Sequence, residues 1–108
     1  MNWTIDREKM TVNFSLAGDL VSTTARDLLA EITALLEKPE AAAFGWTTFQ
    51  LDLASAKMID SVGLNLIALL LKRVQKRGAR LRILYASRNV HRTFLFTRLD
   101  KHVELVKV

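Results

Sequence analysis

Asp60 and Ser61 stand side by side directly before the longest helix that the sequence predicts. Both residue types are favoured at helix N-caps, because a short side-chain oxygen can accept hydrogen bonds from the free backbone N–H groups of the first turn. We expect one of the two to cap this helix. The serine hydroxyl then lies at the positive end of the helix dipole, on a loop that faces solvent.

Other residues that could do chemistry do not form a recognisable catalytic set. Asp19, Asp52 and Asp60 could converge on a cation if all three follow strands, or they could serve as caps and turn residues. A triad of Ser61, His91 and Asp60 is disfavoured, because adjacent Asp and Ser residues do not bracket a histidine. Phosphate-binding loops, dinucleotide fingerprints and nucleophile elbows are missing from the sequence. We therefore predict no enzymatic activity, no cofactor and no metal.

Length and composition are those of an ordinary globular domain. We expect the 108 residues to form one domain, and half of them are hydrophobic. The sequence contains no cysteine, which excludes disulfides and thiol catalysis. The N-terminus lacks the pattern of a signal peptide, and the longest apolar stretch, residues 62–71, is too short to span a bilayer. We expect a cytoplasmic protein without membrane insertion.

Charge is distributed unevenly along the chain. Residues 1–56 carry a balance of −4, whereas residues 57–108 carry +9. The basic half could simply be a solvated helix end and loop, or it could attract an acidic protein or an anionic membrane. Nucleic acid is the least favoured partner, because no aromatic stacking platform or recognition motif accompanies the charge.

Hydrophobic periodicity predicts strands and helices in the order β-β-α-β-α-β-α-β. Strands separated by helices imply parallel pairing through right-handed crossovers, and the first two strands read as a hairpin. Most strands alternate apolar and polar residues, so we expect the helices to cover mainly one face of the sheet. The predicted strands cover residues 3–5, 10–17, 47–53, 80–86 and 103–106, and the predicted helices cover residues 25–37, 61–77 and 87–99.

The helix at residues 61–77 has an apolar face and a polar stripe. Leu64, Ile67, Leu71 and Val74 recur at intervals of three and four and should face the core. Asn65 falls with Ser61 on the exposed stripe, and three further apolar residues flank that stripe. These flanking residues could be covered by another helix, or they could form a docking surface for a partner beside Ser61. They are Val62, Leu66 and Leu69.

Residues 49–64 contain the run Ile59-Asp60-Ser61-Val62-Gly63-Leu64 after a strand that ends in Asp52-Leu53. This run resembles the signature of STAS domains, the family of bacterial anti-sigma factor antagonists. Further matches include Leu16-Ala17-Gly18-Asp19-Leu20, the Gly before the fourth strand, and the Ser-x-x-Val start of the last helix. The resemblance covers essentially the whole chain and implies an α/β fold with a mixed sheet of about five strands.

The resemblance also implies a function. In that family the serine at the position of Ser61 is phosphorylated by a partner kinase that is also the anti-sigma factor, and a phosphatase reverses the modification. Only the unphosphorylated form binds the kinase. The expected partner-binding residues are Asp60, Ser61, Val62, Asn65, Leu66 and Leu69.

An alternative class within the family docks a partner without a phosphate switch. Two positions depart from the pattern of the switched members: Val21, where they often carry Asp, and Val62, where they often carry Ser or Thr. The alternative is a STAS subunit of a lipid-transport ABC system, in which Ser61 would serve only as a helix cap.

Overall fold

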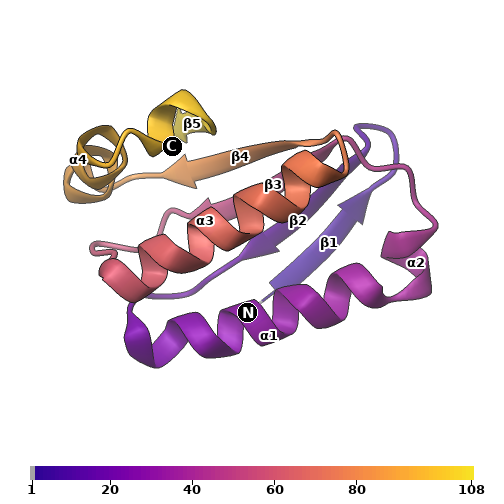
Figure 1. Cartoon of the computed structure of the whole chain (residues 1–108), viewed down its shortest axis with the longest axis horizontal. Helices are drawn as coiled ribbons and strands as arrows, with labels where there is room; N and C mark the ends of the chain where they lie inside the picture. Colours follow the sequence, from indigo (N-terminus) through magenta and orange to yellow (C-terminus); the bar gives the residue numbers. More distant parts are fainter. Residues whose placement is uncertain (1) are drawn as a thin grey trace.

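The hairpin and the three β-α-β crossovers expected from the sequence are all present (Figure 1). The structure is a computed structural model that describes residues 2–108. Its elements are β1 (Asn2–Asp6), β2 (Thr11–Ser15), α1 (Ser22–Glu37), α2 (Pro39–Ala42), β3 (Thr48–Leu53), α3 (Ser61–Lys76), β4 (Arg80–Tyr85), α4 (Arg88–Phe96), the 3-10 helix η1 (Leu99–Lys101) and β5 (Glu104–Lys107).

The strands form one mixed five-stranded sheet in the order β1-β2-β3-β4-β5. β1 pairs antiparallel with β2, and every other pairing is parallel. Each β-α-β crossover connects a strand to the adjacent strand, so the chain moves across the sheet in one direction from β2 to β5. Right-handed crossovers of this kind place all their helices on one face. Figure 1 shows α1 and α3 side by side across that face, as the alternating strands predict.

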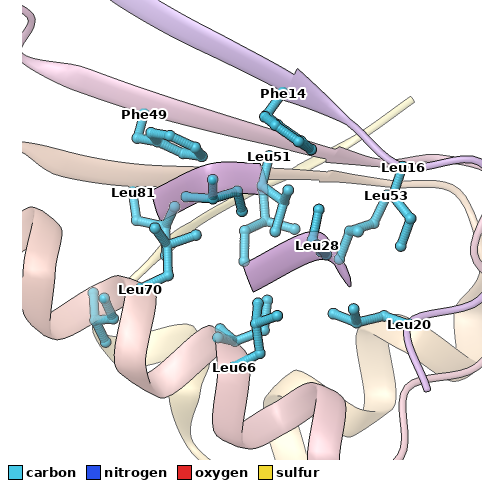
Figure 2. Close-up of a cluster of buried hydrophobic side chains, with 14 of the residues drawn as sticks. Phe14, Leu16, Leu20, Leu28, Phe49, Leu51, Leu53, Leu66, Leu70 and Leu81 are labelled. Carbon is cyan, nitrogen blue, oxygen red and sulfur yellow. The ribbon is translucent and has the colours of Figure 1, made fainter. Parts of the chain in front are cut away.

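The core lies between the sheet and these two helices. Alternate residues of the strands are buried on the helix side, among them Phe14, Phe49 and Leu51, each at most 1% exposed. Figure 2 shows these side chains facing Leu28 of α1 and Leu70 of α3. The alternate buried residues of the strands therefore pack against the apolar faces of the two helices, as the sequence predicts.

The opposite face of the sheet carries a row of polar side chains, one from each strand. The amide of Asn13 donates to Thr4 (3.4 Å), and Gln50 donates to Asn13 (2.9 Å). Arg82 donates to Gln50 (3.3 Å) and pairs with Glu104 (3.3 Å). These contacts join all five strands, because the strand register sets the five residues side by side.

The last helix is shorter than the sequence predicts. We expected it to continue to about residue 99, but α4 ends at Phe96 and η1 begins at Leu99. The Thr97 hydroxyl donates to the carbonyl groups of Thr93 (2.8 Å) and Phe94 (3.3 Å), and Arg98 adopts a left-handed backbone conformation (φ 62°). A left-handed residue ends an α-helix. Within residues 2–108, every helix is too short or too polar to cross a membrane.

Candidate functional site

Asp60 is the residue that caps α3, and it also holds the start of α1. One carboxylate oxygen accepts from the Gly63 N–H (2.9 Å), and the other accepts from the Ser22 N–H (2.8 Å). The hydrogen bond from Gly63, together with that from Ser22, lowers the pKa of Asp60. A single ionised carboxylate therefore joins the N-termini of two helices.

Ser61 is the first residue of α3 and is exposed to solvent. Its hydroxyl has no hydrogen-bond partner among residues 2–108, whereas the neighbouring Asp60 carboxylate accepts two hydrogen bonds. The positive end of the helix dipole lies beside it, although the Gly63 N–H of the first turn is already bonded to Asp60. Ser61 is therefore a solvent-exposed hydroxyl at the N-terminal end of a helix, where negative charge is favoured in general.

The two helix starts are brought together by a single parallel bridge between Leu20 and Ile59. The Leu20 N–H donates to the carbonyl of Met58 (3.1 Å), and the Asp60 N–H donates to the carbonyl of Leu20 (3.2 Å). This close packing of the two helix starts requires glycine at position 63. A Cβ there would lie 2.9 Å from Leu20 Cγ and 3.0 Å from Ile59 Cγ2, and closer still to the Leu20 carbonyl oxygen.

The three aspartates that could have formed a cation site are engaged separately. Asp19 accepts from the N–H groups of Lys57 (2.7 Å) and Met58 (3.2 Å), and Asp52 accepts from that of Ala54 (2.8 Å). Together with Asp60 they serve as caps and turn residues, which was the other possibility from the sequence. Across residues 2–108 no three His, Cys, Asp or Glu side chains gather as metal ligands.

His91 is not arranged for catalysis with Ser61. Its ring stacks on Tyr85, with centroids 4.8 Å apart and planes inclined by 16°. Within the described chain, no hydrogen bond connects His91 to Asp60 or Ser61. The structure therefore does not form the triad considered from the sequence.

A shallow groove of about 210 Å³ runs between α1 and α3 beside Ser61. Val62 and Leu69 form its exposed apolar surface, at 40% and 44% exposure. Leu66 was expected at this surface, but it is only 3% exposed and forms the floor of the groove. This α1–α3 groove is lined by Ala25, Arg26, Leu29, Val62, Asn65, Leu66 and Leu69.

Residues of α1 in this groove were missed by the sequence analysis. Ala25, Arg26 and Leu29 contribute one wall, although the docking surface was predicted from α3 alone. Leu29 lies at the margin of the apolar stripe of α1, where half-buried residues are common, so its position gave only a weak signal. Leu29 could be assigned to the groove only from the packing of α1 against α3.

The sequence matches a known family over nearly its full length. Residues 3–107 match the family described as "Mlab, STAS domain". The chain therefore belongs to the STAS domain family, as the motif around Ser61 predicts. No curated protein matches the sequence.

Solved structures share the fold at low sequence identity. Protein tm1081 of Thermotoga maritima gives a TM-score of 0.79 at 19% identity, covering 99% of this chain and 85% of its own. The anti-sigma factor antagonist SpoIIAA of Bacillus, in its unphosphorylated form, gives 0.70 at 18%, covering 99% and 87%. A sulfate transporter family protein of Wolinella succinogenes gives 0.69 at 16%, covering 88% and 76%. These likenesses confirm the mixed α/β fold.

Proposed function

We propose that this STAS domain is a regulatory binding protein of the anti-sigma factor antagonist type, switched by phosphorylation of Ser61. The observation that carries the proposal is the position of Ser61, exposed at the first residue of α3 and next to the half-exposed Val62 of the α1–α3 groove. In this function the domain is not an enzyme and acts in the cytoplasm. Its partners are an anti-sigma factor that is also a serine kinase, and a phosphatase.

The physical chemistry of the site supports a switch that leaves the fold intact. A phosphate carries a charge of roughly −1.5 to −2 and is tolerated at a helix N-terminus by the free N–H groups and the dipole. The same charge beside Val62 must be desolvated when a partner covers the groove, and it adds to the charge of Asp60. Phosphorylation should therefore weaken partner binding without unfolding the domain.

Existing structures of SpoIIAA are consistent with this expectation. That protein has been solved in both an unphosphorylated and a phosphorylated form, and this chain matches the two with TM-scores of 0.70 and 0.67. The fold that they share therefore accommodates a phosphate. This supports a phosphate on Ser61 that acts on binding rather than on folding.

A second candidate function is that of a transport-associated STAS subunit, such as that of a lipid-transport ABC system. The apolar Val62 directly after Ser61 favours it, because a constitutive docking surface needs no polar group there. The similarity in fold to a sulfate transporter family protein is compatible with it. In that case Ser61 remains unmodified and the same groove binds a subunit of the membrane complex.

Affinity capture from the organism that carries the gene distinguishes the two functions. Wild type, Ser61→Ala and Ser61→Asp are used as baits, and Ser55→Asp is the matched control, since Ser55 is an exposed loop serine. The switch predicts that a serine kinase is captured by all baits except Ser61→Asp, and that some wild-type protein carries one phosphate on Ser61. Capture of one membrane-complex subunit by all four baits, with Ser61 unmodified, would refute the switch in favour of the second candidate.

The groove is tested with a change in its exposed apolar surface. Leu69→Arg should abolish capture of the partner, because a buried apolar contact is replaced by a charge that must be desolvated. Lys72→Ala is the control on the same helix, since Lys72 is exposed and is not part of the groove. Equal capture by both variants would show that the partner binds elsewhere.

A further inference from the structure

The outward face of α4 combines large apolar side chains with arginines. Val90 and Phe94 on the inner face are fully buried. On the outer face Leu95 is 47% exposed, and Phe96 is 91% exposed, the highest value among the exposed large hydrophobic residues of the described chain. An ordinary surface helix is polar on its outer face, whereas the outer face of α4 carries two exposed apolar side chains at its C-terminal end.

Two arginines share that outer face. Residues four apart lie above one another on a helix, so Arg88, Arg92 and Phe96 form one exposed line. Leu95 follows Arg88 by seven residues and flanks the same line. The apolar pair therefore lies at one end of a cationic stripe and not within a polar surface.

The surrounding charge is basic and is not neutralised inside the protein. Between residues 86 and 103 there are four Lys or Arg residues, at positions 88, 92, 98 and 101, and a single acid, Asp100. Among residues 2–108 none of these four cations belongs to a salt bridge. Two other cations of the basic half form salt bridges, Arg73 with Glu37 and Arg82 with Glu104.

Arg77, just after α3, also has partners within the protein. Its guanidinium lies 4.1 Å from the centre of the Trp46 ring and donates to the carbonyl of Phe44 (2.5 Å). Lys57, Lys72, Lys76, Arg80 and Lys107 are also outside the salt bridges of residues 2–108. What distinguishes α4 is that its exposed arginines lie beside the exposed Leu95 and Phe96.

We propose that the outer face of α4 is a peripheral membrane-binding surface that takes up anionic phospholipid. A side chain that is 91% exposed protrudes, and a bilayer can enclose it on all sides without a matching pocket. The arginine stems extend along apolar surface while their charged ends reach lipid phosphates. Phe96 and Leu95 insert at the interface, and Arg88, Arg92, Arg98 and Lys101 bind anionic headgroups. The surface is separate from the α1–α3 groove and does not depend on Ser61.

Insertion can be measured directly, because the chain has no cysteine and a single one can be labelled. Phe96→Cys and the control Lys72→Cys are labelled with an environment-sensitive dye and mixed with vesicles. The proposal predicts a blue shift at position 96, none at 72, and none with vesicles of phosphatidylcholine alone. The shift requires vesicles that also contain phosphatidylglycerol. An unshifted label at position 96 with the mixed vesicles would overturn the proposal.

Binding to the same mixed vesicles is then measured by co-sedimentation of unlabelled variants. Phe96→Ser should weaken binding about tenfold, through loss of one inserted aromatic ring. Arg92→Gln with Arg98→Gln should weaken it about thirtyfold, and the control pair Lys72→Gln with Lys76→Gln by a much smaller factor. Equal losses for the two pairs would mean attraction by net charge alone, against the proposal. A dye shift with soluble polyaspartate but not with vesicles would point instead to an acidic protein and would also overturn it.

Discussion

Gly63→Ala should be the most informative single-atom test of how the site is built. The new Cβ would lie 2.9 Å from Leu20 Cγ and 3.0 Å from Ile59 Cγ2, and it would meet the Leu20 carbonyl oxygen more closely. The side-chain atoms could move by a few tenths of an ångström. The carbonyl cannot, because it accepts the Asp60 N–H and belongs to the bridge that joins the two helix starts.

Two opposing effects set the magnitude. Alanine within a helix is favoured over glycine by about 1 kcal/mol, whereas overpacking against fixed backbone costs up to about 3 kcal/mol. The free energy of unfolding should therefore fall by about 2 kcal/mol. For a protein of this size that corresponds to a decrease in Tm of roughly 8–16 °C.

Gly45→Ala is the matched control for this change. A Cβ at position 45 would meet only Met10 Cε, at 3.6 Å, which is an ordinary contact. We expect this variant to be unchanged or more stable by up to about 1 kcal/mol, because alanine restricts the unfolded chain. Urea unfolding of both variants measures the difference. If Gly63→Ala were as stable as Gly45→Ala, the close approach of the two helix starts would be refuted.

Three further outcomes follow from the geometry. The lowered pKa of Asp60 stabilises the fold above about pH 4, and this contribution is lost as the pH falls through the folded-state pKa. When the free energy of unfolding is measured against pH in acid, Asp60→Asn should therefore lose less stability than wild type. Phe94→Ala should cost about 3–5 kcal/mol in urea unfolding, since the ring is fully buried, and a smaller loss would contradict that packing. Arg82→Gln should lower the free energy of unfolding by less than about 1 kcal/mol, because its ion pair is half exposed. A larger decrease, measured by thermal unfolding, would show that the polar row is a main source of stability.

Much of the fold could be predicted from the sequence because its local signals agree. The alternation in β3, Phe49-Gln50-Leu51-Asp52-Leu53, corresponds residue by residue to buried and half-buried positions. Asp60 and Ser61 marked the start of α3 correctly, since caps are set by local chemistry. Right-handed crossovers then required the helices to lie on one face, which accounts for the polar row opposite.

Features that depend on pairing between elements could not be predicted. Periodicity located Leu66 at the edge of an exposed stripe, but it could not tell that α1 would cover it and leave Val62 and Leu69 half exposed. The second hydrogen bond of Asp60, to the N–H of Ser22, joins residues 38 apart in sequence. The early end of α4 coincides with the left-handed backbone of Arg98 (φ 62°), a conformation that is uncommon for a residue other than glycine and that the sequence pattern does not indicate.

The central claim is that the surface beside Ser61 binds a protein and that charge on Ser61 controls this binding. The most direct test is a calorimetric titration of the captured partner, once purified, against unmodified protein and against protein phosphorylated on Ser61. We predict that phosphorylation weakens binding at least tenfold, while the thermal unfolding of the two forms stays alike. Equal affinity of the partner for both forms would contradict the account.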